Sequence, residues 1–196
     1  MTSGVGAVEA GALDTELVRA ARLGDRVAFE ELLGRHGPGL YRYAIRSTRN
    51  VADAQDVVQE TFVGAWRGLD GFDGRSSVRT WLFAILHRKI VDQHRRRPRE
   101  EPVSELPEDP AASAQLSVAA TPGPFDTASS AELVRALDAA LRRLPYRQRA
   151  CWILVEVDGL AQPEVARVLG LTPDAVRGQL YRARRALAEL MREWQG

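Results

Sequence analysis

The chain has 196 residues, of which 45% are hydrophobic, and its formal net charge is +1. This length and apolar content fit two small folded domains or one of medium size. The single cysteine, Cys151, excludes an internal disulfide, and we interpret it as a core side chain because it lies in an apolar run. No apolar run is long enough to cross a membrane and no signal peptide is recognisable, so we expect a soluble cytoplasmic protein without membrane insertion.

Charge divides the chain into segments. Residues 13–99 and 131–196 each have a net positive charge, whereas residues 100–130 carry six acidic side chains, no basic ones and several prolines. Such a stretch neither sustains a helix nor buries a core. The predicted order is a disordered N-terminus over 1–13, a helical domain over 14–97, a flexible acidic linker over 98–130 and a helical domain over 131–196.

Helical periodicity runs through both domains without sustained strand alternation, which predicts an all-α fold. Asp14 and Asp25 are expected to cap the first two helices, and the second helix has a weak point at Gly37 and Pro38. A third helix is predicted over residues 51–69, with an apolar inner row. Its outer face is polar and is expected to contain Asp53, Asp56, Gln59 and Glu60.

A fourth helix is predicted over residues 76–97, where three consecutive arginines precede Pro98. Cationic and hydroxyl side chains alternate with rings from Phe72 onward. This mixture is typical of surfaces that hold phosphates and unstacked bases. Trp81 fits a core position at least as well as a base contact, whereas residues 94–97 favour contact with a polyanion.

The second domain is predicted to contain four helices, over residues 132–143, 146–157, 164–169 and 172–191. Thr172 is expected to cap the last helix, with Pro173 and Asp174 in its first turn. One face carries an apolar stripe, made of Val176, Leu180, Ala183, Leu187 and Leu190. The other faces are basic through Arg177, Arg182, Arg184 and Arg185.

A basic helix face is also typical of a merely solvated surface. Here a short amphipathic helix and a tight turn at Gly170 come before it. That order is the pattern of a helix-turn-helix, whose second helix enters the DNA major groove. The pattern therefore favours DNA binding.

The pattern of reactive side chains does not indicate an enzyme. His36, His87 and His94 are too dispersed for a metal site, and we identify no nucleophile, phosphate-binding loop or pair of catalytic acids. We expect no catalytic residue, no metal and no cofactor.

Four segments together resemble one protein family. They are DAQDVVQETFVGAW over residues 53–66, FDGRSSVRTWL over 72–82, LPYRQR over 144–149 and VRGQLYRARRAL over 176–187. In this order they resemble a bacterial sigma factor of the extracytoplasmic-function (ECF) group of the sigma-70 family. The resemblance implies a non-enzymatic subunit that binds core RNA polymerase and directs promoter-specific initiation.

The resemblance also implies roles for particular residues. The third helix would dock on the clamp helices of the β′ subunit, and the second domain would meet the β flap. The implied polymerase-binding residues are Asp53, Asp56, Gln59, Glu60 and Trp66. The implied −10 residues are Phe72, Ser76, Ser77, Arg79, Thr80, Trp81, His87, Arg88, Arg95 and Arg96. The implied −35 residues are Thr172, Pro173, Asp174, Arg177, Gln179, Tyr181, Arg182 and Arg185. A cytoplasmic anti-sigma factor is a further implied partner.

Among the −35 residues, Arg177 and Tyr181 are expected nearest the bases, and Thr172, Arg182 and Arg185 at phosphates. Arg184 is expected to face inward or toward the flanking helix.

The chain departs from the family pattern at three places. His87-Arg88 stands where many members have Arg-Asn, Ala161 replaces a usual Ser or Thr cap, and Gln179 replaces a common basic residue. The −10 preference of the family therefore does not transfer. Two alternatives stay open, a stand-alone helix-turn-helix regulator and a module that binds acidic proteins.

Overall fold

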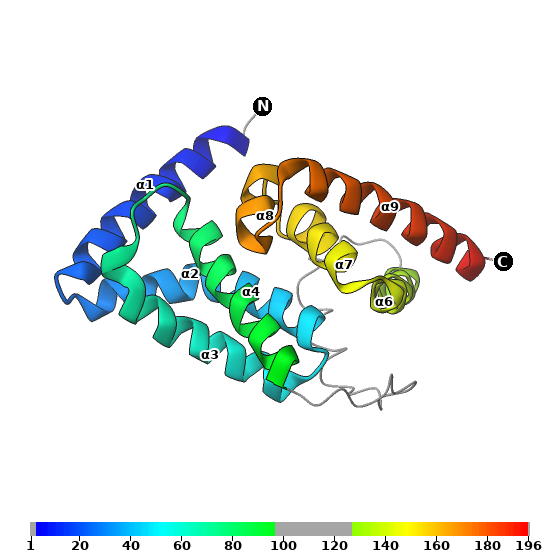
Figure 1. Ribbon diagram of the computed structural model, residues 1–196, viewed down its shortest axis with the longest axis horizontal. Helices are drawn as coiled ribbons and strands as arrows, with labels where there is room; N and C mark the ends of the chain where they lie inside the picture. Colours follow the sequence, from blue (N-terminus) through cyan, green and yellow to red (C-terminus); the bar gives the residue numbers. More distant parts are fainter. Residues whose placement is uncertain (1–2, 97–126, 196) are drawn as a thin grey trace. The chain divides into compact units, whose positions relative to one another are not determined.

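The computed structural model describes residues 3–96 and 127–195, and every regular element in these ranges is helical (Figure 1). The described residues form two compact units, one containing α1 to α4 and the other built on α6, α7 and α9. The all-α expectation is confirmed. The helices of the first unit are α1 (Ser3–Arg22), α2 (Arg26–Thr48), α3 (Val51–Gly68) and α4 (Val78–Arg96). Those that follow are α6 (Thr127–Arg143), α7 (Tyr146–Trp152), α8 (Gln162–Leu169) and α9 (Pro173–Gln195).

The predicted linker over 98–130 lies mostly outside the described residues, and α6 begins at Thr127, within its last part. At the other end of the chain, α1 already begins at Ser3, inside the stretch for which disorder is predicted.

The expected cap at Asp14 is wrong, because this residue lies in the middle of α1 and its side chain is buried. Its Oδ2 atom is 2.8 Å from Nε2 of His36, and its Oδ1 atom is 3.2 Å from Nε of Arg35. A buried carboxylate needs such partners, since desolvation without them is costly. Asp14 therefore ties α1 to α2 instead of starting a helix.

The second helix begins as predicted. Oδ1 of Asp25 accepts hydrogen bonds from the backbone N–H groups of Val27 (2.9 Å) and Ala28 (3.2 Å), which is an N-cap. The helix continues through Pro38, the predicted weak point, and ends at Thr48.

The core of the first unit lies where α2 packs against α3 and α4 (Figure 1). Tyr43 and Leu40 of α2, together with Phe83 and Leu86 of α4, are almost fully buried. The rings of Tyr43 and Phe83 meet edge to face with centroids 5.7 Å apart. Each such side chain stabilises the fold by about 1.5–3 kcal/mol through burial.

The core of the second unit lies between α9 and the two helices α6 and α7. Its buried cluster contains Leu141 and Leu144 from the end of α6 and Ala183 and Leu187 from α9. A single π-helical turn over Ile153–Val157 extends α7, so residues 146–157 are helical as predicted. Cys151 is fully buried, which agrees with its interpretation as a core side chain.

Candidate nucleic-acid interface

The basic face of α9 is positioned by its first turn and by its apolar stripe. The hydroxyl of Thr172 accepts a hydrogen bond from the N–H of Ala175 at 3.2 Å, which is the predicted N-cap. Val176, Leu180 and Ala183 are buried as predicted. Because successive turns of one helix carry this stripe, the arginine-bearing faces of α9 are directed outward.

Several cationic or aromatic side chains are exposed on α9, and those among the predicted −35 residues are Arg177, Tyr181, Arg182 and Arg185. Tyr181 is 67% exposed, which is unusual for a large ring with an apolar body. An exposed tyrosine among arginines is suited to contact nucleic acid, because its ring and hydroxyl can meet bases while guanidinium groups meet phosphates. The structure thus brings most of the predicted −35 residues onto one surface.

Ion pairs distinguish the arginines of this helix. Arg177 pairs with Asp174 one turn earlier, and Arg185 pairs with Glu189 one turn later. Arg182 makes no ion pair with any residue that the structure describes. Its charge is therefore available to an anionic ligand without breaking a contact.

Arg184 has a different role from its neighbours. It pairs with Glu156 in the π-helical turn after α7 through two of its nitrogens, so it faces the flanking helix, one of its two predicted positions. Gln179 is half-buried, and Pro173 and Asp174 are exposed at the start of the helix.

The helix before α9 begins at Gln162 even though Ala161 offers no side-chain cap. A carboxylate oxygen of Glu164 accepts a hydrogen bond from the N–H of Ala161 at 3.0 Å, which is half of a capping box. Gly170 ends the helix with φ of +64°, a left-handed conformation that favours glycine. The tight turn between α8 and α9 thus depends on this residue.

The loop that leads into α4 is more closely packed than the sequence predicts. Phe72 is buried, and its ring centroid lies 5.0 Å from that of Trp81. The hydroxyl of Ser77 accepts a hydrogen bond from the N–H of Thr80 (3.1 Å) and is also hydrogen-bonded to the hydroxyl of Thr80 (2.8 Å). Ser77 therefore caps α4. Thr80 is 1% exposed.

Three of the predicted −10 residues, Phe72, Thr80 and His87, are buried in the first unit, and their contact with DNA stays a prediction. Periodicity on α4 is a weak guide to exposure, since α1, α2 and α3 all pack against this helix. Burial lowers the pKa of His87 to about 4, so its imidazole is neutral near pH 7 and offers no charge to a phosphate.

The remaining −10 candidates reach solvent to different degrees. Ser76, Arg79 and Trp81 are half-buried, and the guanidinium of Arg79 lies 5.7 Å from the ring centroid of Phe83. Arg88, Arg95 and Arg96 are exposed. The structure thus leaves a basic surface along α4, with its last two arginines in the final turn of the helix.

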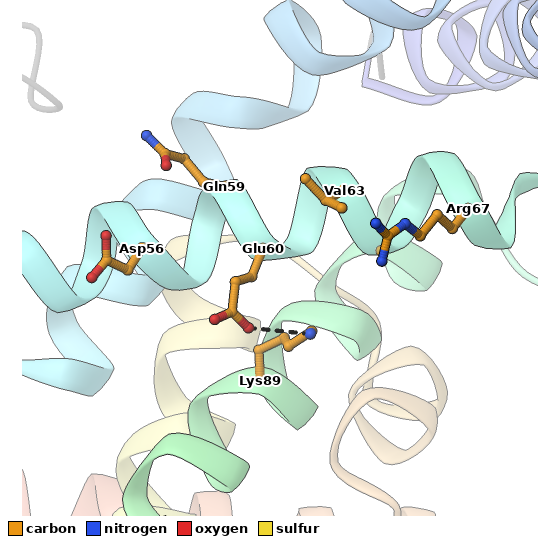
Figure 2. Close-up of a pocket in the computed structure, with 7 residues that line it drawn as sticks. Asp56, Gln59, Glu60, Val63, Arg67 and Lys89 are labelled. Atoms are coloured by element: carbon orange, nitrogen blue, oxygen red, sulfur yellow. Dashed lines mark ion pairs between the residues drawn. The ribbon is translucent and has the colours of Figure 1, made fainter.

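A groove of about 490 Å³ lies beside the outer face of α3. Figure 2 shows that most of its lining comes from α3, with Lys89 reaching it from α4. The lining residues are Asp56, Gln59, Glu60, Val63, Gly64, Arg67 and Lys89. Glu60 and Lys89 form an ion pair with 3.1 Å between Oε2 and Nζ. Of the predicted polymerase-binding residues, Asp56, Gln59 and Glu60 are thus brought together.

Two of the predicted polymerase-binding residues lie elsewhere. Asp53 is buried, and its Oδ1 atom accepts a hydrogen bond from the amide of Gln93 at 3.2 Å, so its placement on the outer face is wrong. Asp53 lies three residues after the N-cap Asn50, in the first turn of α3, where an acidic side chain is favoured. This spacing is the signal in the sequence for a position at the helix start instead of on the outer face. Trp66 is partly exposed and meets Phe29 edge to face at 4.9 Å.

Sequence reasoning missed Val63, Arg67 and Lys89 as parts of this groove. The first two continue the row of Asp56 and Glu60 at helical spacing, so the signal was present in the sequence. Lys89 comes from another helix, and no local pattern could place it.

Neither a metal cluster nor a membrane span is found in the described parts of the chain. No group of three or more His, Cys, Asp or Glu side chains there could hold a metal ion. Among the described helices, none combines the length and the apolar character that crossing a bilayer requires.

Comparison with known proteins gives two family matches and a set of relatives. Residues 32–100 match Sigma-70 region 2, and residues 134–187 match Sigma-70, region 4. The chain is 34% identical to the ECF RNA polymerase sigma factor SigM of Mycobacterium tuberculosis, over 91% of this chain and 84% of SigM. It is 37% identical to the RNA polymerase sigma factor CnrH of Cupriavidus metallidurans, over 91% and 94% of the two chains.

Solved structures agree with these matches. The structure of CnrH in complex with the cytosolic domain of CnrY is similar with a TM-score of 0.68 and 31% identity, covering 92% of this chain and 98% of that one. The sigma factor RpoE in complex with the anti-sigma factor NepR from Bartonella quintana has a TM-score of 0.64 and 26% identity, covering 84% and 96%.

Proposed function

Because the chain belongs to the ECF sigma factors of the sigma-70 family, which serve transcription initiation, we propose that it binds core RNA polymerase and directs it to promoters by reading two DNA elements. The observation that carries this proposal is the outward face of α9, where Arg177, Tyr181 and Arg182 are exposed opposite a buried stripe. A positioned, basic second helix after a tight turn suits the DNA major groove.

The −35 element is read by α9. Arg177 and Tyr181 lie near the start and middle of the helix and contact bases, because an arginine can donate two hydrogen bonds to guanine. Thr172, Arg182 and Arg185 contact phosphates, which fixes the register of the helix on the duplex. Within the described residues no ion pair holds Arg182, so its charge can meet a phosphate directly.

The −10 element is bound by α4 and the loop before it. With Phe72, Thr80 and His87 buried, the accessible contacts are Ser76 and Trp81 at the start of the helix. Binding of the displaced single strand at this end offsets the cost of unpairing the duplex. The exposed arginines of α4 hold its phosphates: Arg88, Arg95 and Arg96.

Core polymerase binds the groove beside α3. Asp56 and Glu60 supply negative charge there, and the half-exposed Val63 supplies an apolar contact. Arg67 and Lys89 also line the groove, so the complementary partner helix places basic side chains opposite Asp56 and Glu60 and an apolar one opposite Val63. The clamp helices of the β′ subunit are the proposed partner. The β flap is the corresponding partner of the second unit.

An anti-sigma factor is a further proposed partner. The similar structures of CnrH and of the Bartonella quintana RpoE were both solved with a second protein, and NepR is an anti-sigma factor. A protein that covers the α3 groove or the α9 face would hold this chain inactive.

The proposed function is tested by in vitro transcription with core RNA polymerase, this chain and a library of randomised promoters. We expect initiation from a defined subset of templates that share two elements, and none without the chain. A chain that supports no initiation, and that is not retained by core polymerase in a pull-down, would contradict the proposal. DNA binding without polymerase binding would instead favour a stand-alone helix-turn-helix regulator.

A further inference from the structure

The last residue of α1 reaches across the first unit to the loop between α3 and α4. Nε of Arg22 donates a hydrogen bond to the backbone carbonyl of Leu69 at 3.0 Å. Nη2 of the same guanidinium donates to the carbonyl of Phe72. The two carbonyls lie at the start and just after the end of a single 3-10 turn, Leu69–Gly71. One side chain therefore spans this turn.

The two carbonyls lie just beyond the C-terminal end of α3. The last carbonyls of an α-helix have no partner within it, and a cation near this end is favoured by the helix dipole. The carbonyl of Leu69 also accepts the N–H of Phe72 at 3.2 Å, so three hydrogen bonds meet at this turn. A guanidinium suits two divergent acceptors because its donors form a rigid planar fork.

The position of Phe72 is transmitted to the start of α4. Its buried ring packs on Trp81, and Gly68 lies beside the same indole, where an added Cβ would make an ordinary contact at 3.7 Å. Beyond Phe72, Asp73 accepts the N–H of Arg75 at 3.0 Å, and Gly74 turns the chain with φ of +72°. A shift of the backbone at Phe72 would therefore move Trp81 and the segment up to Ser77.

Arg22 lies outside the part of the chain that matches the family model, which begins at residue 32. It is 47 residues from Leu69 in the sequence, so no local pattern connects them. The contact is a feature of this fold that the matched motifs do not contain.

We propose that Arg22 is a positioning residue for the −10 strand: it holds the loop over residues 69–77 in the shape that accepts an unstacked base. The inference rests on the proposed function of this loop. Arg22 acts through the loop and not by touching DNA, so its loss removes the binding gained from one base and leaves binding to the sugar-phosphate chain unchanged. A phosphate contact would weaken all strands uniformly.

The test compares polymerase holoenzymes that contain the wild-type chain or single variants. Arg22→Gln removes the charge and the fork, and Arg22→Lys keeps the charge without the fork. Arg19→Gln is the matched control, because Arg19 is exposed one turn earlier on α1 and also carries a positive charge. The probe is a single-stranded oligonucleotide selected from a random pool by wild-type holoenzyme, with an abasic residue placed at each position in turn.

For the wild type we expect about tenfold weaker binding when the captured base is missing, the effect typical of one stacked base. For Arg22→Gln the ratio of the affinities for the intact strand and the abasic strand falls to about twofold or less, while the affinity for the abasic strand stays the same. Arg22→Lys gives an intermediate ratio, and Arg19→Gln gives the wild-type ratio. In the free chain, amide exchange of residues 69–77 is faster in Arg22→Gln than in the control.

A wild-type ratio in Arg22→Gln would overturn the inference and leave the proposed function intact. Uniform weakening of every strand in Arg22→Gln, with full recovery in Arg22→Lys, would overturn it in favour of a phosphate contact. If the wild-type holoenzyme itself shows no sensitive position, the proposed reading of the −10 strand fails together with the inference. If Arg22→Gln does not fold, the ratio of Arg22→Lys decides in the same way.

Discussion

The hydroxyl of Tyr43 and Nδ1 of His87 are hydrogen-bonded at 3.0 Å in the core of the first unit. Tyr43 is fully buried, and His87 is nearly so. The cost of burying a charge lowers the pKa of His87 to about 4, against 6.5 for an exposed imidazole. This hydrogen bond joins α2 to α4, and burial keeps the imidazole neutral near pH 7.

Acid should therefore destabilise the first unit. Below the unfolded pKa the unfolded chain takes up a proton at this imidazole and the folded chain does not, so stability is lost as the pH falls from about 6.5 toward about 4. From neutral pH to about pH 5 the free energy of unfolding should drop by about 2 kcal/mol. Urea unfolding at each pH measures this free energy, with pulsed amide exchange in peptides from α2 and α4 reporting the unfolded fraction of the first unit.

The comparison variant is His87→Gln, which cannot titrate. Its stability should change less with pH, and subtracting its profile removes the contribution of the other acidic groups and of His36, whose pKa burial also lowers. Tyr43→Phe should keep the pH dependence, since desolvation and not the hydrogen bond causes the shift. An unchanged profile in His87→Gln would show that His87 is accessible to water.

The buried side of a helix was predictable from periodicity where only one face of that helix packs against its neighbours. In α9, the stripe of Val176, Leu180 and Ala183 correctly predicted which side is buried, and Thr172 marked the start. In α3 the same reasoning placed Asp56 and Glu60 outside correctly. A 3.6-residue period is informative when one side of a helix packs and the other is solvated.

Prediction failed where tertiary contacts decide exposure. His87 and Thr80 are polar, yet α4 has neighbours on several sides and encloses both. Asp14 and Asp53 are acidic, yet each is buried against partners from another helix, Arg35 and Gln93 among them. Such pairings join residues far apart in the sequence, so local sequence patterns do not predict them.

Loss of two outward arginines should weaken promoter binding. We expect Arg177→Ala with Arg182→Ala to reduce the affinity of holoenzyme for promoter DNA by about 10- to 100-fold, since a base contact and a phosphate contact are both lost. The slope of log affinity against log salt should also fall by about one, because of the lost phosphate contact. Filter binding or fluorescence anisotropy at several salt concentrations measures both quantities.

The matched control is Arg184→Ala. This arginine is exposed on the same helix but pairs with Glu156 on the flanking turn, so its removal should leave the salt slope unchanged. A double variant that binds the promoter as the wild type does would exclude this face of α9 from the interface.

The two acidic side chains that line the α3 groove should matter for binding core polymerase. Asp56→Ala with Glu60→Ala should weaken that binding by about tenfold, since two charges that face a basic partner are removed. Lys89→Ala should bind as well as the wild type or more tightly, because it releases Glu60 from its ion pair. Size-exclusion or anisotropy titration with labelled chain measures the affinity.

An acidic residue outside the groove serves as the control. Glu31 is exposed on α2, and Glu31→Ala should bind core polymerase normally. Equal weakening by Glu31→Ala would indicate that only net charge matters, and no weakening by the double variant would remove the groove from the interface.

The turn between α8 and α9 should be sensitive to residue type at position 170. Gly170 has φ of +64°, and a Cβ there would meet nothing within 4 Å, so only backbone strain opposes substitution. Gly170→Ala should destabilise the turn between α8 and α9 by about 1 kcal/mol, whereas Gly170→Asn should cost less because asparagine tolerates this conformation. Urea unfolding followed by amide exchange of α9 measures the difference, and equal costs would contradict the strain explanation.

The one cysteine of the chain should be inert while the second unit is folded. Cys151 is fully buried in α7, and burial raises the pKa of its thiol to about 11. Thiol reagents attack the thiolate, and a pKa raised by this amount lowers the thiolate fraction by about 100-fold even before access is considered. Labelling of the native chain should therefore follow opening of the second unit, and become fast and complete in denaturant.

A reactive control can be built on the same helix. Arg147 is exposed in the first turn of α7, so Arg147→Cys in a Cys151→Ala background should react at the rate of a free thiol. Cys151→Ser should destabilise the unit by about 1–3 kcal/mol more than Cys151→Ala does, because a hydroxyl without a partner is costly in an apolar site. Rapid labelling of Cys151 in the native chain would contradict the burial of its thiol in the folded second unit.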